Sequence, residues 1–229
     1  MSTDALSSNA GSTGAMRVGA VRFDAVILAG GKGSRLGGLS KPIALGRDGE
    51  TLLDMVIRAA SEAERIVVVG DVPARDGILL ARESPPFSGP ASALACGLGI
   101  LSANPAPFTL VLAADQPDVG PAVAALVQAL MTTDGRQEDG AIAIDATNRD
   151  QYLIGIYSTA ALRKRLLALS AASPSRAPTA ADLSMRSLIS GLVLARVTVP
   201  LGSADDVDTW DDAARLGVGL VTTRAGTPS

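Results

Sequence analysis

Histidine is absent from this 229-residue sequence, cysteine occurs once, and aromatic residues make up only 3% of it. Without histidine the chain cannot form a Ser-His-Asp triad, use an imidazole general base or hold a metal through imidazole. The single cysteine, Cys96, excludes an intramolecular disulfide framework. Hydrophobic residues nevertheless make up 47% of the chain. The core must therefore be built mainly from Ala, Val, Leu and Ile, a composition common in layered α/β proteins.

Basic clusters and long apolar runs are lacking as well. The formal net charge is −3 without any block of Lys and Arg, so we expect no nucleic-acid partner. No apolar run is long enough to span a membrane, and the Ser-, Thr-, Gly- and Ala-rich residues 1–20 lack the apolar core of a signal peptide. We therefore expect a cytoplasmic protein with no membrane partner. We expect residues 1–21 to form a disordered leader and residues 22–229 a single domain.

Short aliphatic runs alternate with stretches of helical periodicity along the chain. The expected strands span residues 23–29, 65–70, 77–81, 108–117, 141–145, 151–158 and 193–200. The expected helices span residues 50–63, 89–103, 121–131, 159–171, 184–192 and 206–217. This alternation predicts an α/β three-layer sandwich, in which helices cover both faces of a mostly parallel central sheet. Ligands of such sheets bind at the carboxyl ends of the strands.

A glycine-rich loop, LAGGKGSRLGGLSKP (28–42), follows the first expected strand. It holds five glycines, two lysines and an arginine. Glycines let backbone N–H groups approach a ligand closely, and the cations indicate an anionic ligand, with phosphate as the first candidate. The spacing does not match G-x-x-x-x-G-K-[ST], because Leu39 follows Gly38. It does not match G-x-G-x-x-G either, because Leu36 stands at the third glycine position.

The loop does fit the pattern LAGG-x-G-x-R-[LM]-G-G-x-x-K, and three further motifs follow in order. These are GPASAL (89–94), the acidic turn ADQP (114–117) and DVDT (206–209). Together they resemble nucleotidyltransferases with a Rossmann-like, GT-A-like fold, and among these most closely the molybdenum cofactor guanylyltransferases. The resemblance runs from about residue 23 to 217. It implies transfer of GMP from GTP to molybdopterin with release of pyrophosphate, and transient contact with proteins that handle the cofactor.

The resemblance also implies roles for particular residues. Lys41, Arg35 and Asp115 would be catalytic, the two cations by neutralising the triphosphate and the departing pyrophosphate. Glu83 would read guanine, whose N1–H and amino group form a donor pair that a carboxylate accepts. The expected nucleotide-binding residues are Leu28, Ala29, Gly30, Gly31, Gly33, Lys41, Gly70, Glu83 and Asp115. The alternative for Lys41 is an ordinary surface lysine.

Acidic residues are the candidates for holding a metal. Asp115 ends an apolar strand, where packing does not explain a carboxylate, and oxygen ligands suit Mg²⁺. We expect Mg²⁺ on Asp115 and Asp208. Asp115 could instead cap a turn before Pro117, and Asp206 and Asp208 could cap the last helix and interact with its dipole.

Asp150, Gln151 and Tyr152 lie where the resemblance places the second substrate, and Arg186 lies on the short helix expected over residues 184–192. Asp150, Gln151 and Tyr152 would touch the acceptor, and Arg186 would meet its phosphate. Plain surface roles are the alternative for all four.

Several functions stay open on the sequence alone. Ser40 replaces the aspartate that often precedes the loop lysine, and the following Lys-Pro pair is common in other nucleotidyltransferases. CMP transfer to molybdopterin or to another phosphate acceptor is therefore one alternative. GMP transfer to a phospholactate-type acid is a second, and a non-catalytic nucleotide-binding partner is a third. The failed dinucleotide pattern makes a nicotinamide reductase the weakest reading.

Overall fold

The computed structural model describes residues 21–30, 49–86, 88–132, 138–171 and 184–219. Its seven strands form one sheet in the order β3-β2-β1-β4-β6-β5-β7. The strands are β1 (Phe23–Leu28), β2 (Ile66–Val69), β3 (Ile78–Ala81), β4 (Phe108–Ala113), β5 (Gly140–Ile144), β6 (Asp150–Ser158) and β7 (Leu194–Thr198). Only β6 runs against its neighbours, β4 and β5, while the other described pairs are parallel. The expected mostly parallel sheet is confirmed.

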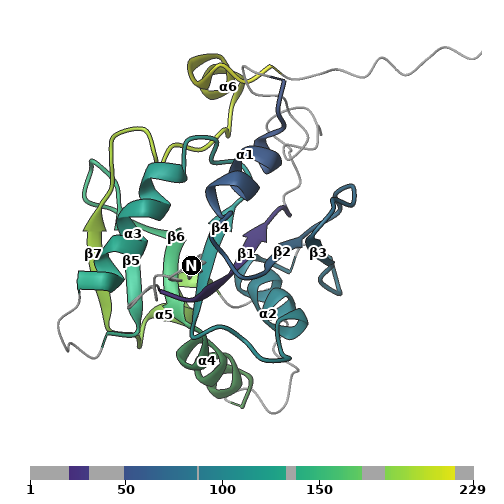
Figure 1. Ribbon diagram of the computed structural model, residues 1–229, viewed down its shortest axis with the longest axis vertical. Coiled ribbons are helices and arrows are strands. Elements are labelled where there is room, and N and C mark those ends of the chain that lie inside the picture. Colours follow the sequence, from purple (N-terminus) through teal and green to yellow (C-terminus); the bar gives the residue numbers. More distant parts are fainter. Residues whose placement is uncertain (1–20, 31–48, 87, 133–137, 172–183, 220–229) are drawn as a thin grey trace, which may run out of the picture.

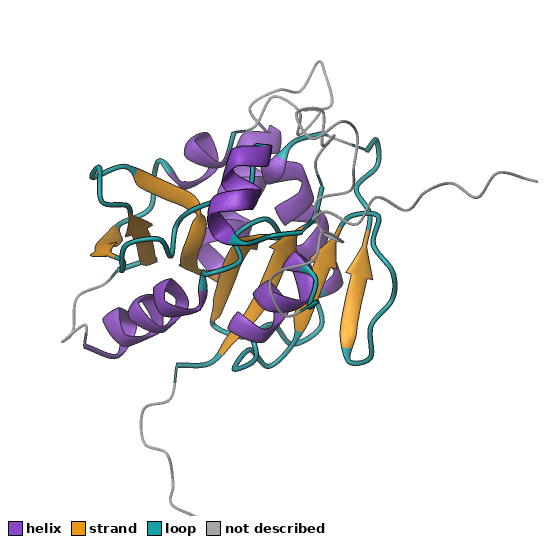
Figure 2. Cartoon of the chain, turned by 90° about the horizontal axis from the view of Figure 1, so that it is seen from above, coloured by secondary structure: helices purple, strands orange, loops and turns teal. Residues whose placement is uncertain are grey.

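Helices cover both faces of the sheet, as Figures 1 and 2 show. One face packs against α1 (Leu52–Ala59) and α3 (Gly120–Thr132), and the other against α2 (Pro90–Ile100), α4 (Thr159–Ala171) and α5 (Met185–Ile189). Because side chains alternate along a strand, β1 serves both cores. Ala25 and Ile27 enter the α1/α3 core, whereas Val26 and Leu28 enter the α2/α4/α5 core. The three-layer sandwich follows from this double burial.

The last helix, α6 (Trp210–Leu216), begins later than the sequence pattern predicts. The expected start at residue 206 is wrong. Thr209 is the N-cap, and its side chain accepts from the Asp212 N–H while the Asp212 carboxylate accepts from the Thr209 N–H. This reciprocal capping box satisfies two of the N–H groups that a helix start leaves over. Asp206 and Asp208 therefore precede the helix and do not cap it.

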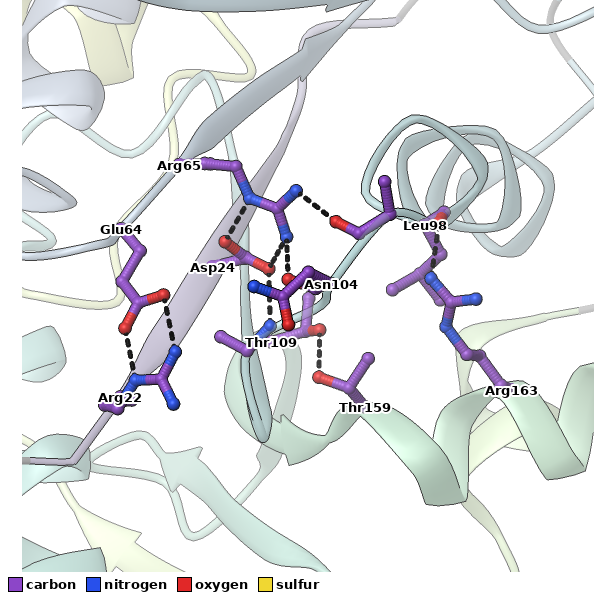
Figure 3. Close-up of polar contacts among 11 residues, drawn as sticks. Arg22, Asp24, Glu64, Arg65, Leu98, Asn104, Thr109, Thr159 and Arg163 are labelled. Carbon is purple, nitrogen blue, oxygen red and sulfur yellow. Dashed lines mark hydrogen bonds and ion pairs between the residues drawn. The ribbon is translucent and has the colours of Figure 1, made fainter.

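A polar network lies where the parallel strands of the sheet begin, which we call the amino edge; the carboxyl edge is where these strands end (Figure 3). Asp24 at the start of β1 is only 1% exposed. Its carboxylate receives two hydrogen bonds from the Arg65 guanidinium, at 2.9 and 2.7 Å, and one from the Ala106 N–H at 2.9 Å. Arg65 also donates to the carbonyl of Ala103 at 2.8 Å. A charge can be buried at low cost only when it is matched in this way, so this edge is structural.

None of the described helices combines the length and the apolar character that a transmembrane helix needs.

Candidate active site

A cavity of about 660 Å³ opens at the carboxyl edge of the sheet, opposite the Asp24 network. Its wall comes from the ends of β1 and β4, the segment after β3, the start of β6, and the amino-terminal ends of α2 and α5. The start of β6 reaches this edge because β6 is antiparallel to β4. The lining residues are Leu28, Gly30, Glu83, Gly89, Pro90, Ala93, Ala113, Asp115, Gln116, Asp150, Gln151, Tyr152, Leu153, Ser184, Met185, Arg186 and Asp206. The topology alone thus gathers separate chain segments around one space.

Three carboxylates meet beside this cavity. Asp115 follows β4, and Asp206 and Asp208 come from the segment before α6, yet one oxygen of each lies within 4.8 Å of the others. Val207 between them is fully buried against Leu52, and its N–H donates to the carbonyl of Asp115 at 3.0 Å. This anchor fixes both flanking aspartates next to the end of β4. Carboxylate oxygens gathered at this spacing suit a hard divalent cation.

The capping alternative for Asp206 and Asp208 is answered by α6 itself. Thr209 and Asp212 supply the cap, so the helix start does not account for the two earlier aspartates. The cluster brings together the two residues expected to hold the metal, Asp115 and Asp208, and adds Asp206 to them. The sequence motif DVDT contains Asp206 and Asp208, but only the fold shows that they lie next to Asp115.

Glu83 contributes a fourth carboxylate, on the β3 and α2 side of the cavity. Its Oε1 accepts a hydrogen bond from the Ser88 N–H at 3.1 Å. Its Oε2 is buried and, among the described residues, has no hydrogen-bond partner. A buried oxygen without a donor is unfavourable, and such groups in native proteins call for an explanation. A ligand that brings hydrogen-bond donors to this wall is one.

The remaining expected nucleotide-binding positions differ in where they lie. Leu28 and Gly30 line the cavity, whereas Ala29 and Gly70 are not part of its wall. A Cβ on Gly70 would lie 2.8 Å from the carbonyl oxygen of Ala29, so close backbone packing requires glycine there. The expected Gly31, Gly33, Arg35 and Lys41 lie outside the described residues.

The four residues that the sequence analysis expects to contact a second substrate all line the cavity. Asp150, Gln151 and Tyr152 line it from β6, and the exposed Arg186 lines it from α5. Asp150 is also engaged by Arg196, whose Nε lies 2.8 Å from its carboxylate.

Side chains from outside the cavity hold α5 in place. Arg165 of α4 donates to the carbonyls of Leu188 and Ser187, both at 3.2 Å, and Ser184 caps the helix start. The short helix is therefore fixed where Arg186 faces the cavity.

Sequence reasoning missed some wall residues. Gln116, Leu153, Ser184 and Met185 line the cavity without having been singled out. Gln116 lies inside the acidic turn, so its position beside Asp115 was a usable signal. The other three carry no chemical signature, and only the fold places them there.

A family model described as "MobA-like NTP transferase domain" matches residues 25–186. No curated protein matches the sequence.

Several solved structures resemble the chain. Molybdopterin-guanine dinucleotide biosynthesis protein A from Archaeoglobus fulgidus is 18% identical, with a TM-score of 0.61 over 85% of this chain and 97% of that one. A Mycobacterium sp. strain JC1 homologue of Mycobacterium tuberculosis Rv0371c is 25% identical, with a TM-score of 0.58 over 86% and 95%. The 2-C-methyl-D-erythritol 4-phosphate cytidylyltransferase of Thermus thermophilus is 19% identical, with a TM-score of 0.54 over 86% and 97%.

Proposed function

We propose that this chain, which belongs to the MobA-like NTP transferase domain family, transfers GMP from GTP to a phosphate-bearing acceptor and releases pyrophosphate. The acceptor we propose is molybdopterin. Membership of the family makes the chain an enzyme of the nucleotidyltransferase class. The choice of base, acceptor and metal goes beyond the family and rests on the cavity.

Glu83 is the observation that carries the choice of guanine. Its carboxylate stands in the cavity wall with Oε2 buried and without a donor among the described residues. Guanine offers two adjacent donors, N1–H and the 2-amino group, to such a carboxylate. A site with an unfilled acceptor rejects a base that lacks a donor there, because the oxygen would stay unpaired. Adenine has no N–H at N1, so ATP fits this wall less well.

The carboxylate cluster fits Mg²⁺ as the metal. Asp115, Asp206 and Asp208 each offer one oxygen within 4.8 Å of the others, and Mg²⁺ prefers oxygen ligands together with phosphates. Mg²⁺ bound there would neutralise negative charge on the triphosphate. The three aspartates would hold it between the Glu83 wall and the β6 wall of the cavity.

The chemistry requires no general base. An oxygen of the acceptor phosphate, already ionised at neutral pH, attacks the α-phosphorus of GTP. A bond forms between that oxygen and phosphorus, the bond from the α-phosphorus to the bridging oxygen breaks, and pyrophosphate leaves with the electron pair. Lys41 and Arg35 would stabilise the charge on the leaving group. A chain without histidine can run this reaction through positioning and charge neutralisation.

We assign the two substrates to different parts of the cavity wall. Leu28, Gly30 and Glu83 belong to the side formed by β1, β3 and α2, which we assign to the nucleotide. β4 separates β1 from β6 in the sheet, and Asp115 follows β4. The side formed by β6 and α5 is therefore left for the acceptor. Arg186, an exposed cation on that side, suits a phosphate monoester.

CMP transfer is the second candidate. The fold is also similar to that of a cytidylyltransferase from Thermus thermophilus. Cytosine brings one amino donor, which a single free carboxylate oxygen could accept. The two candidates therefore differ in base preference rather than in the arrangement of the carboxylates.

The test is pyrophosphate release with Mg²⁺ and each of GTP, CTP, ATP and UTP, with and without molybdopterin. Release with GTP that depends on molybdopterin would support the proposal. Release with CTP while GTP is inactive would replace it by the second candidate. Binding of GTP without pyrophosphate release under any of these conditions would indicate a non-catalytic nucleotide-binding protein.

A further inference from the structure

The acceptor side of the cavity contains an irregularity in β6. Ile142 of β5 pairs with Gly155, but the next residue, Ala143, pairs with Gln151. Residues 152–154 of β6 thus have no partner on β5 and interrupt the ladder. Bulges of this kind redirect side chains and are common beside active sites. Here the interruption places Tyr152 and Leu153 in the cavity wall.

The buried side chain of Tyr157 contacts the backbone of this bulge. Tyr157 is fully buried, and its hydroxyl donates to the carbonyl of Tyr152 at 3.0 Å. Burial raises the pKa of Tyr157, so its hydroxyl keeps the proton that it donates. The ring lies over Gly155, where an added Cβ would come within 2.3 Å of the Tyr157 oxygen. Gly155 and Tyr157 together fix the backbone at Tyr152.

The Asp145 carboxylate fixes the preceding side chain, Gln151. Its Oδ1 accepts from the Thr147 N–H and hydroxyl and from the Arg149 N–H, at 2.7 to 3.0 Å, which closes the β5–β6 turn. Its Oδ2 accepts from the Gln151 Nε2 at 2.7 Å. One carboxylate therefore holds both the turn and the amide.

The orientation of the Gln151 amide follows from the charge of Asp145. The Thr147 hydroxyl and nearby N–H donors lower the pKa of Asp145 to about 2, so the group is a carboxylate at neutral pH and can only accept. The amide must therefore turn its NH₂ towards Asp145. Its Oε1 makes no hydrogen bond to any described residue, and because Gln151 lines the cavity, this oxygen is available to a ligand there.

We infer that Gln151 is a specificity-determining residue that accepts a hydrogen bond from the acceptor, and that Asp145 is the positioning residue that holds its oxygen in place. The inference rests on the proposed function in assigning this side of the cavity to the acceptor. The acceptor is then a phosphate monoester that also carries an N–H or O–H donor. Molybdopterin, whose pterin has an amino group, and 2-C-methylerythritol 4-phosphate, a polyol, satisfy this requirement. Phospholactate has no such donor at neutral pH.

The experiment measures the dissociation constants of these three compounds by calorimetry, for the wild-type chain and four variants. Gln151→Met removes the acceptor oxygen at similar volume, and should weaken binding of a donor-bearing probe by about tenfold. Asp145→Asn lets the Gln151 amide turn over and should weaken binding by about threefold. Thr147→Val removes a turn contact only and should leave binding unchanged.

The fourth variant reverses the hydrogen bond between the two side chains. In Asp145→Asn combined with Gln151→Glu, the introduced amide can donate to the introduced carboxylate, whose second oxygen again faces the cavity. The net charge of the pair is preserved. Binding should therefore return to within about twofold of wild type, because both the hydrogen bond between the side chains and the acceptor oxygen of residue 151 are restored.

Three results would overturn the inference. In the first, wild type and Gln151→Met bind a donor-bearing probe equally well. In the second, the double variant does not recover binding. In the third, wild type binds only phospholactate, or binds none of the three probes. A different result would refute the proposed function without refuting the inference. Wild type would bind 2-C-methylerythritol 4-phosphate in a Gln151-dependent way but release no pyrophosphate from GTP with molybdopterin, and the inference would stand.

Discussion

The two edges of the central sheet use aspartate in opposite ways. At the amino edge, Asp24 is almost completely buried, and Arg65 and the Ala106 N–H occupy its oxygens. At the carboxyl edge, Asp115, Asp206 and Asp208 are half-buried or exposed and stand together as three like charges. The first arrangement matches a charge with its opposite, which a fold needs. The second gathers carboxylates beside the cavity, which suits the metal site that we propose there.

We propose that this difference in surroundings separates the structural carboxylate, Asp24, from functional carboxylates at the other edge. Replacing a structural carboxylate should lower stability and leave the rate of the folded molecules unchanged. Replacing a functional one should do the reverse, and often stabilises by relieving repulsion.

The largest effect is expected at the amino edge. Asp24→Ala leaves the Arg65 guanidinium and the Ala106 N–H without their acceptor, and should lower the free energy of unfolding by about 3–5 kcal/mol. Urea titration followed by circular dichroism measures this. Activity per folded molecule should equal that of wild type. A variant as stable as wild type would show that the Asp24 network does not hold the sheet together.

Asp115→Asn should act on the rate instead. The isosteric amide removes one charge from the cluster, and loss of one charge-stabilising contact typically slows turnover by about 10²–10³. Steady-state pyrophosphate release with Mg²⁺ and GTP measures this. The matched control is Asp118→Asn, which makes the same charge change at an exposed position outside this cavity. Comparable loss in both variants would remove the special role of the cluster.

Glu83→Gln should change base selectivity. The introduced amide can still accept from the Ser88 N–H, but it then turns its NH₂ towards the donors of guanine. GTP should bind about tenfold more weakly, with little change for ATP. Competition binding with a fluorescent nucleotide measures both constants. An unchanged GTP to ATP ratio would show that Glu83 does not read the base.

Glu64→Gln should have the smallest effect. Glu64 pairs with Arg22 at the protein surface, near the Asp24 network (Figure 3), and both side chains are well exposed. Solvent and salt screen such pairs. We expect no resolvable change in the urea midpoint or in the rate. A large loss of stability here would mean that proximity to the amino edge, rather than burial of the ion pair, determines the effect.

Much of the fold could be predicted from the sequence, because alternating buried faces leave a strong periodic signal. The alternation of strands and helices does not give the direction of β6. That direction follows instead from the short connection between the expected strands 141–145 and 151–158, because a connection without a helix joins antiparallel neighbours. The sequence pattern starts α6 too early, at residue 206, because aspartates lie on both sides of Thr209 and each of them could serve as the N-cap.

The candidate site was harder to predict than the fold. The cavity includes Leu28, Gly30, Glu83 and Asp115, four of the residues that the sequence predicts for the nucleotide site, and their roles stay predictions. A glycine alone does not indicate a binding site, as Gly70 shows. Close packing against Ala29 requires glycine there, just as close approach of a ligand would. The Asp145–Gln151 pair was not predictable as an orienting device, because its meaning depends on which oxygen of Asp145 the turn already uses.

The reaction that we propose at the carboxyl edge is transfer of GMP to molybdopterin. Mass spectrometry of the product formed from molybdopterin, Mg²⁺ and an equimolar mixture of GTP and CTP tests it most directly. We expect a single new species, molybdopterin plus GMP, formed by wild type and by Asp118→Asn and strongly reduced in Asp115→Asn. A cytosine-containing product, or no dinucleotide at all, would contradict it.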